Sequence, residues 1–393
     1  MSTIILPRVI RLGGGVLAET GQALQLLGLR SPTIITDPFL LKSGNVTKLQ
    51  NILEKAGLNV SVFAETVPDP TTDCVNEAAD FVRARQSDCV IGFGGGSSID
   101  TAKAAAILAL KPVQIRALKA PHQENTPALP IIAIPTTAGT GSEATRFTII
   151  TDTQTDEKIL CIGAAYLPTL AVVDYELTLT MPPRLTADTG VDALTHAIEA
   201  YVSRLANPFS DSMALSGMRV IWANLRSAYH EPENRMAREQ VMFGAMQAGI
   251  AFSNASVALV HGMSRPIGAH FHVAHGLSNA MLLPAVTRWS LEGNFPRYAD
   301  CARVMQIAGE TDTDRQAAGK LVEALQHLNV ELAVPGPRAY GLDEKRWHDL
   351  LPVMAEQALA SGSPANNPRR ADAKTIIQIY QEVWNGESEK TFI

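Results

Sequence analysis

Histidines are concentrated in one short stretch of this 393-residue chain. Four of its nine histidines, His261, His270, His272 and His275, lie in HGMSRPIGAHFHVAHG, residues 261–276. Imidazole groups can ligate a metal ion, carry protons or serve as buried polar groups. Their irregular spacing does not choose among these roles, so their partners have to be sought elsewhere in the chain.

A second segment places a carboxylate and an imidazole four residues apart. Asp192 and His196 lie in GVDALTHAIEAY, residues 190–201, which has a strongly helical composition. This spacing puts both side chains on one helical face, as half of a divalent-metal site or as an Asp–His hydrogen bond that orients a core histidine. Two histidines from the first stretch would complete a site of three nitrogens and one oxygen. Such a site with a position left open for substrate is the catalytic type.

A glycine triplet follows an apolar run in CVIGFGGGSSIDTAKAAA, residues 89–106. Gly94, Gly95 and Gly96 allow a tight turn and a close approach of the backbone to a ligand. The N–H groups of Ser97 and Ser98 would then lie at the positive end of a helix, which suits a pyrophosphate. The alternative is a glycine-rich turn without a ligand.

The segment IPTTAGTGSEATR, residues 134–146, ends another expected strand in hydroxyl and glycine residues. Two such loops at the carboxyl ends of strands in one sheet mark the crevice where open α/β sheets bind nucleotides. Neither loop carries the GKS/T sequence of a P-loop, which disfavours ATP chemistry. Asp37, at the end of the TIIT run, could accept hydrogen bonds from ribose hydroxyls or could form a turn before Pro38.

Alternation of β-branched runs with helical stretches predicts an α/β fold with a parallel sheet for the first 180 residues. We expect strands at 33–36, 59–65, 89–93 and 130–135, a strand around Lys158, and helices at 43–57, 72–86 (with Thr72 as N-cap) and 98–110. Long Ala-rich segments with a period near 3.6 follow at 184–205, 238–263 and 315–328. We therefore expect an α/β dinucleotide-binding domain over 1–180 and an all-helical metal-binding domain over 181–393.

The composition is that of a globular protein, with 46% hydrophobic and 18% charged residues. A net charge of −6 without a basic run disfavours nucleic acid as a partner. No apolar run approaches the roughly 20 residues of a membrane span, and the N-terminus does not have the pattern of a signal peptide. The four scattered cysteines show no CxxC spacing, so we expect no disulfides and a cytoplasmic location.

The motifs GGGSSIDTAK, PTTAGTGSE and DALTHAIEAY, with HGM at 261 and AHG at 274, resemble those of the iron-dependent (group III) alcohol dehydrogenase family. They occur in the family's order, and the resemblance runs from residue 1 to about 390. It implies an enzyme that interconverts a small alcohol with its aldehyde or ketone, using NAD and Fe²⁺, with Zn²⁺ as the alternative metal. It also implies two domains and a homodimer or larger homo-oligomer.

The resemblance assigns roles to particular residues. It implies Asp192, His196, His261 and His275 as metal ligands. It implies cofactor contacts from Gly94, Gly95, Gly96, Ser97, Ser98 and Asp100 (with Lys103 completing the motif), from Thr136, Thr137 and Thr140 at the nicotinamide, from Lys158 at a ribose, and from Leu177 and Thr180 near the adenosine. Phe252 would form an apolar wall of the substrate pocket.

The chain departs from the family pattern beside the expected ligands. Many members have a second histidine four residues after the first, and here that position is Arg265. Arg265 either turns towards solvent or faces the pocket, where a guanidinium favours an anionic group. That group could be a side chain such as Glu143 or an acidic group of the substrate. We expect the helix to end near this point because Pro266 follows. His270 and His272 stand where other residues are usual, and either could carry the substrate's proton away together with water.

Other functions compete with this interpretation. A lyase like the dehydroquinate synthases shares the architecture, but the glycine- and threonine-rich motifs favour the dehydrogenases. A hydroxyacid–oxoacid transhydrogenase would keep its NAD bound between half-reactions. A non-catalytic metal- and nucleotide-binding scaffold would be expected to lack a ligand or a loop glycine, and this sequence lacks neither.

Overall fold

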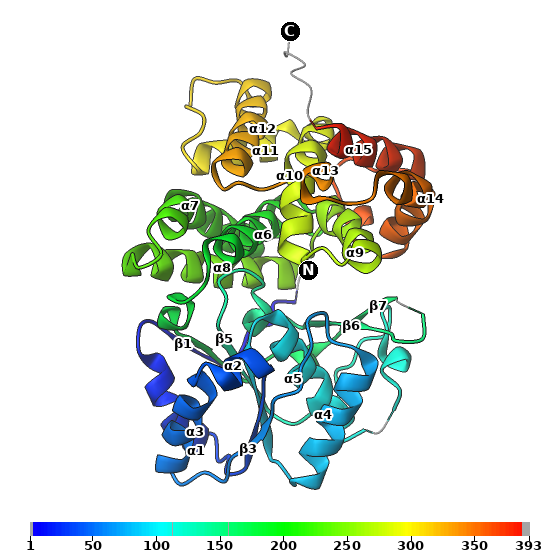
Figure 1. Cartoon of the computed structure of the whole chain (residues 1–393). Helices are drawn as coiled ribbons and strands as arrows, with labels where there is room; N and C mark the ends of the chain where they lie inside the picture. Colours follow the sequence, from blue (N-terminus) through cyan, green and yellow to red (C-terminus); the bar gives the residue numbers. More distant parts are fainter. Residues whose placement is uncertain (1–2, 112, 156, 387–393) are drawn as a thin grey trace. The chain divides into compact units, whose positions relative to one another are not determined.

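The computed structural model describes residues 3–111, 113–155 and 157–386. The chain forms two compact units, one from Thr3 to Met181 and one that begins at Pro182. In Figure 1 the first unit is blue to green and contains a sheet with helices, whereas the second, green to red, is built from helices. The predicted fold class, an α/β part followed by a helical part, is confirmed.

The first unit is built on a six-stranded parallel sheet. In spatial order its strands are β1 (Val9–Leu12), β8 (Leu170–Val173), β5 (Ile131–Pro135), β4 (Cys89–Gly94), β2 (Pro32–Ile35) and β3 (Ser61–Phe63). Strands β1 and β8 were not predicted. Lys158 begins β7 (Lys158–Ile162), which forms an antiparallel hairpin with β6 (Phe147–Thr151).

Helices cover both faces of this sheet. They are α1 (Thr20–Leu26), α2 (Pro38–Lys42), α3 (Asn45–Lys55), α4 (Thr72–Ala84) and α5 (Gly96–Leu108). Successive strand residues point to opposite faces, so Ile34 packs in the core with α1 and α3 while Ile35 packs in the core with α4 and α5. Both faces of the sheet are therefore covered by apolar side chains. Polar side chains lie at the ends of the strands, where the loops begin.

The N-cap of α4 is Thr71, so the prediction of Thr72 was wrong by one residue. The Thr71 hydroxyl accepts a hydrogen bond from the Cys74 N–H at 3.3 Å. Thr71 also bridges Thr151 in the β6–β7 hairpin, which keeps its backbone extended. The helix consequently begins at Thr72, one residue earlier than an N-cap at Thr72 would place it.

In the second unit the described residues, 182–386, form helices and no strand. The helices are α6 (Pro183–Val202), α7 (Pro208–His230), α8 (Arg235–Ala255), α9 (Leu259–Phe271), α10 (His275–Ser290), α11 (Phe295–Val304), α12 (Asp314–Glu331), α13 (Pro337–Tyr340), α14 (Glu344–Ala360) and α15 (Ala373–Asn385). Among these residues and those described before them, no single helix is long and apolar enough to cross a membrane. Helices α8 and α9 pass that test only as a pair, and they are bent by 103° at their break.

Two expectations about α8 and α9 were wrong. The segment 238–263 is not one helix, because the chain breaks at Ser256, whose φ of 66° is left-handed. Helix α9 also does not end before Pro266 but continues to Phe271. A proline inside a helix removes one hydrogen bond. Packing of α9 against α10 and α14 offsets that loss.

Candidate metal centre and cofactor loop

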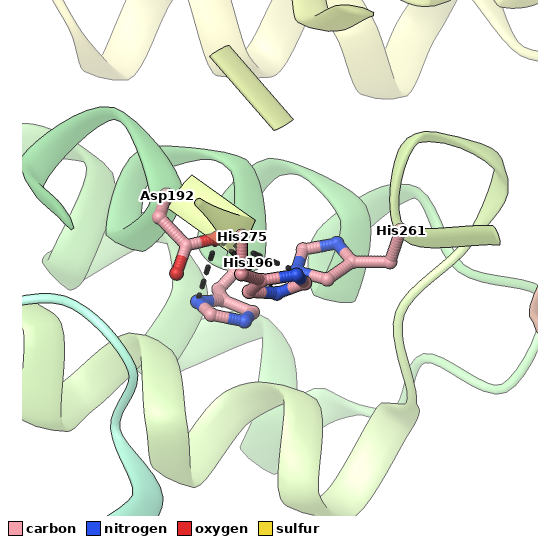
Figure 2. A group of neighbouring side chains, drawn as sticks. All are labelled: Asp192, His196, His261 and His275. Carbon is pink, nitrogen blue, oxygen red and sulfur yellow. Dashed lines mark ion pairs between the residues drawn. The ribbon is translucent and has the colours of Figure 1, made fainter. Parts of the chain in front are cut away.

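Four side chains predicted as metal ligands converge in the second unit. Asp192 and His196 come from α6, His261 from α9 and His275 from the first position of α10. One ligand atom from each lies within 4.8 Å of the others. Figure 2 shows the carboxylate and the three imidazoles directed towards one another. The i,i+4 spacing in α6 therefore places its two side chains on the same face as expected.

The dimensions and chemistry of this cluster fit a divalent transition metal. Asp192 Oδ1 lies 4.0 Å from His196 Nδ1, 3.6 Å from His261 Nε2 and 3.9 Å from His275 Nε2. Ligands bonded to one ion at roughly 2.0–2.2 Å must lie about 3–4.4 Å apart. Three imidazole nitrogens with one carboxylate oxygen suit Fe²⁺ or Zn²⁺ better than Mg²⁺ or Ca²⁺. The His275 side chain is 36% exposed and the other three are buried, so the cluster is accessible from the His275 side.

A glycine allows α6 and α10 to come close enough to share this site. A Cβ on Gly276 would lie 2.5 Å from the carbonyl oxygen of Asp188 and 3.4 Å from the Cβ of Asp192. A side chain at residue 276 would therefore push the start of α10 away from α6. Because His275 is the neighbouring residue, this close approach brings its imidazole to Asp192.

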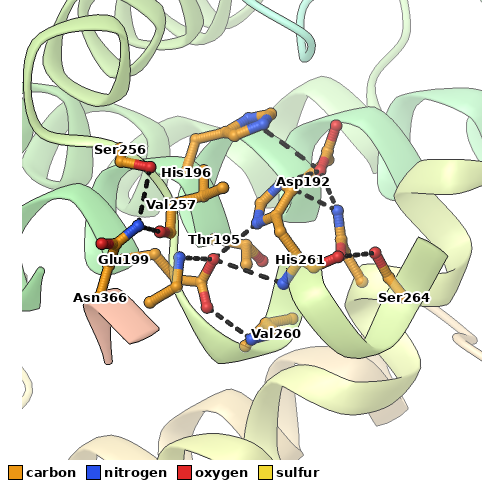
Figure 3. A network of polar contacts seen from close by, with 12 residues as sticks. Asp192, Thr195, His196, Glu199, Ser256, Val257, Val260, His261, Ser264 and Asn366 are labelled. Carbon is orange, nitrogen blue, oxygen red and sulfur yellow. Dashed lines mark hydrogen bonds and ion pairs between the residues drawn. The ribbon is translucent and has the colours of Figure 1, made fainter. Parts of the chain in front are cut away.

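The break between α8 and α9 positions His261. Asn366, in the turn η7 (Ser363–Asn366), donates hydrogen bonds to the Ser256 hydroxyl at 3.0 Å and to the Val257 carbonyl at 3.2 Å. A Cβ on Gly262 would lie 2.6 Å from the ring of Pro364 in the same turn. The first turn of α9 is thus held against η7, as Figure 3 shows for Asn366.

Glu199 accepts hydrogen bonds on the side of His261 that faces away from the cluster. It lies on α6, seven residues after Asp192, and is buried. Its carboxylate accepts from the N–H groups of Ala258 at 2.9 Å and Val260 at 2.6 Å, and it lies 2.7 Å from His261 Nδ1 (Figure 3). One carboxylate therefore contacts both the start of α9 and the His261 imidazole.

The ionisable groups of the cluster stabilise one another's charge. Burial alone would raise the pKa of Asp192, but the nearby imidazoles of His196, His275 and His261 hold it well below its usual range. Burial alone would lower the pKa of His261, but hydrogen bonds and charges from Asp192 and Glu199 raise it to about 9. The Asp192 carboxylate is thus ionised and suited to a cation at the cluster.

Asn279 also contacts the cluster and was not predicted. Its Nδ2 donates to Asp192 Oδ1 at 2.6 Å and lies 3.1 Å from His261 Nε2 and 3.2 Å from His275 Nε2. Its Oδ1 is buried and has no hydrogen-bond partner in the described part of the chain. The Asn279 amide therefore contacts three of the four clustered side chains at the atoms that face one another.

The other predicted catalytic residues lie at different places around this cluster. Phe252 stacks on His196, with ring centroids 4.3 Å apart. Arg265 lies one turn after His261 on α9 and donates a long hydrogen bond, 3.4 Å, to the Ser361 carbonyl. His270 Nε2 contacts Gln357 at 2.8 Å, and His272, with a left-handed φ of 55°, is exposed at the end of α9. Neither His270 nor His272 belongs to the ligand cluster.

In the first unit the two glycine-containing loops lie side by side. A Cβ on Gly95 would contact the side chain of Thr137 at 3.7 Å, and one on Gly96 would contact Thr140 at 3.0 Å. The Thr136 N–H donates to the Gly94 carbonyl at 2.9 Å, which extends the pairing of β4 with β5 into the loops. The threonines therefore lie beside the N-terminus of α5, whose first turn contains Ser97 and Ser98.

Several predicted cofactor residues already have protein partners. The carboxylate of Asp100 accepts from the Ser142 hydroxyl at 2.7 Å and from the Ile149 N–H at 3.0 Å. Lys103 is buried and donates to the Thr145 carbonyl and hydroxyl and to the Phe147 carbonyl. These two side chains tie α5 to the segment after β5. They hold the loops in position without needing to contact a cofactor.

The remaining predicted cofactor residues of this unit are Asp37, Lys158, Leu177 and Thr180. Asp37 is the N-cap of α2 and accepts from the Leu40 N–H at 2.9 Å, which is the turn-forming alternative for this residue. Lys158 Nζ lies 2.6 Å from Asp69 Oδ1. Leu177 packs against the core under α1 and α3, whereas Thr180 is exposed.

Glu199 and Asn279 are the site residues that the sequence interpretation missed. Glu199 continues the i, i+4, i+7 face of Asp192 and His196, and Asn279 lies four residues after His275. The same helical spacing that identified the first pair would therefore have found both residues.

Family models and relatives agree with this geometry. The model of the iron-containing alcohol dehydrogenases matches residues 7–175, and that of the C-terminal part of the same family matches residues 186–384. A 1,3-propanediol dehydrogenase of Klebsiella pneumoniae is 35% identical over 98% of this chain and 99% of its own. A crystal structure of a 1,3-propanediol oxidoreductase has a TM-score of 0.94 and 34% identity, covering 98% of this chain and 100% of that chain.

A structure of sulfoacetaldehyde reductase from Bifidobacterium kashiwanohense in complex with NAD⁺ has a TM-score of 0.87. It is 27% identical and covers 98% of this chain and 100% of that chain. These matches span both units and include every motif on which the resemblance rested. The chain belongs to the iron-containing alcohol dehydrogenase family.

Proposed function

We propose that this protein is a metal-dependent alcohol dehydrogenase that uses NAD(H) to interconvert a small alcohol with its aldehyde or ketone. The observation that supports this most strongly is the cluster of Asp192, His196, His261 and His275, of which His275 is partly exposed and the other three are buried. Membership of the family supports Fe²⁺ as the metal, with Zn²⁺ as the alternative for this donor set.

Each group has a defined task in this proposal. The metal ion supplies Lewis acidity towards the substrate oxygen, and NAD takes up or supplies the hydride. Phe252, stacked on His196, excludes water from one side of the cluster. The N–H groups at the start of α5 bind the pyrophosphate beside the Thr136–Thr140 loop. The substrate's proton leaves through water, with His270 or His272 as the carrier.

A screen of the purified, iron-loaded protein against a panel of aldehydes tests the function. We expect NADH absorbance to fall with several short aldehydes. We also expect NADH to exceed NADPH in kcat/KM, because a carboxylate at Asp37 repels a 2′-phosphate. The Asp37→Gly variant should have a smaller ratio of kcat/KM for NADH to kcat/KM for NADPH than the parent. Turnover of no aldehyde by a fully metal-loaded protein would contradict the proposal, and reaction only with an added oxoacid would indicate a transhydrogenase.

Arg265 gives a reason to propose an anionic substrate. Among the described residues its Nε is buried without a hydrogen-bond partner, and its guanidinium donates one long hydrogen bond, 3.4 Å, to the Ser361 carbonyl. Burial lowers the pKa of Arg265 to about 10, against the favourable charge of Glu199, so the group stays protonated at neutral pH. A partly buried cation with one long hydrogen bond is costly unless an anion pairs with it. A substrate carboxylate, phosphate or sulfonate meets that need.

We therefore expect the enzyme to prefer short aldehydes that carry an acidic group. A charge-assisted contact is worth about 1.5–3 kcal/mol, so kcat/KM for succinic semialdehyde should exceed that for butanal by roughly ten- to a hundredfold. Arg265→His should reduce this ratio and leave butanal turnover nearly unchanged. Arg346→Gln, which removes a guanidinium from the nearby α14, is the matched control and should preserve the ratio. Equal use of both aldehydes by the parent would show that Arg265 does not bind the substrate.

Two further features of the proposal follow from the sequence and the family. None of the four cysteines forms a disulfide, which supports a cytoplasmic enzyme. The resemblance also supports a homodimer or larger homo-oligomer. The substrate is the only other partner proposed.

A further inference from the structure

The structure joins a backbone break to a metal ligand through one buried carboxylate. Glu199 Oε2 accepts from the Ala258 N–H at 2.9 Å and contacts both the N–H (3.4 Å) and Nδ1 (2.7 Å) of His261. Its Oε1 accepts from the Val260 N–H at 2.6 Å. Figure 3 shows these contacts converging on one side chain from the first turn of α9.

The chemistry of these contacts determines the form of His261. An ionised carboxylate can only accept hydrogen bonds, so the His261 Nδ1 that it contacts carries a hydrogen. Nε2, on the other side of the ring, faces Asp192 and Asn279. A neutral imidazole protonated at Nδ1 has its lone pair on Nε2, which is the atom a metal needs.

We propose that Glu199 is a positioning residue that fixes the orientation of His261 and keeps a hydrogen on its Nδ1, so that Nε2 is the ring atom directed at the metal. The same carboxylate accepts hydrogen bonds from the first turn of α9. It therefore determines both where α9 begins after the break and the direction of the His261 imidazole. This inference rests on the proposed metal site but not on the proposed reaction. Its test can therefore use metal binding alone.

Glu199→Gln is a near-isosteric test because an amide cannot satisfy four donors. If the amide oxygen takes the Oε2 position, the amide NH₂ faces the Val260 N–H. If the amide is reversed, its NH₂ faces His261 Nδ1, and the ring can satisfy it only by moving its proton to Nε2. In the first arrangement the Val260 N–H and the amide NH₂ are buried donors without an acceptor. In the second, the proton on Nε2 blocks the atom that would bind the metal.

The measurement is the affinity for Co²⁺ alone, by competition with a chromogenic chelator and by the visible spectrum of the bound ion. We expect Glu199→Gln to bind Co²⁺ about ten- to a hundredfold more weakly than the parent, with a changed spectrum. In a His261→Ala background the same substitution should have no further effect, since the two residues act through one contact. Affinity within about twofold of the parent would overturn the proposal, given the size of such effects elsewhere.

A control separates positioning from general destabilisation. Asn207→Ala removes the capping box of α7, where Asn207 accepts from the Ser210 N–H at 3.1 Å. It should lower the melting temperature but leave Co²⁺ affinity unchanged.

If Glu199→Gln does not fold, Glu199→Asp is the substitute variant. The aspartate keeps the negative charge, but its shorter side chain moves the carboxylate away from His261 by one methylene. Parent-like Co²⁺ affinity in folded Glu199→Asp would equally overturn the proposal. If Co²⁺ binding follows Glu199 but no aldehyde is reduced, the proposed reaction fails and this inference stands.

Discussion

Replacing any one of the four clustered side chains with alanine should abolish turnover while the helical unit stays folded. His261→Ala leaves Asp192 and two imidazoles, which hold a divalent ion more weakly and in a different geometry. Lewis acidity at the substrate oxygen is worth several kcal/mol, so kcat should fall on the order of a thousandfold or more. The measurements are metal content by mass spectrometry of the dialysed protein, kcat with a good aldehyde, and the circular dichroism of the variant.

The matched control comes from the same stretch of sequence. His272 is exposed at the end of α9, outside the cluster, and His272→Ala should keep its metal. Full activity with a stoichiometric metal in His275→Ala would refute the ligand set. Loss of metal in His272→Ala would show instead that a different pair of histidines from this stretch binds the ion.

The parts of the fold that the sequence predicted are those decided by local periodicity. The buried strands β2, β4 and β5 are short runs of β-branched residues, and α6 and α12 have clear helical periods. The spacing of Asp192 and His196 likewise contains its own geometry, because a helix puts residues four apart on one face. Such features need no information about distant parts of the chain.

The features that the sequence did not predict depend on contacts between distant residues. The break at Ser256 is held by Asn366, which is 110 residues away in the chain. Thr71, and not Thr72, is the N-cap of α4 because its backbone forms a β-bridge with Thr151. Glu199 looks like an ordinary helix residue until α9 is placed against it. Pairing His261 and His275 with the α6 residues needed the resemblance to a family, since spacing alone left four candidates.

The buried positions of Asp100 and Lys103 show a related limit. A motif identifies residues that belong together, but it does not say which of them contact the ligand. Here both side chains are engaged by Ser142, Thr145 and the β6 backbone. The motif therefore contains the glycines that would approach a cofactor and also the polar groups that hold those glycines in place.

Gly94→Ala should weaken cofactor binding more than any other single change in the first unit. Gly94 has a φ of 152°, in the region that L-residues avoid, and an added Cβ would lie 2.6 Å from the Ser98 Oγ. The Ser98 side chain is buried and contacts the Thr66 hydroxyl at 3.1 Å, so it cannot simply swing away. The loop or the start of α5 must shift, and the N–H groups proposed to bind the pyrophosphate shift with it.

The expected result is a rise of about a hundredfold or more in KM for NADH, because two or more charge-assisted contacts of about 1.5–3 kcal/mol each are disturbed. Metal content should not change, since the ligands belong to the other unit. Gly44→Ala is the control: Gly44 also has a left-handed φ, of 84°, but a Cβ there meets nothing within 4 Å. It should cost about 1 kcal/mol of stability and leave KM for NADH as in the parent. If Gly94→Ala and Gly44→Ala have the same KM for NADH, the glycine loop does not bind the cofactor, and the nucleotide site has to be sought elsewhere in this unit.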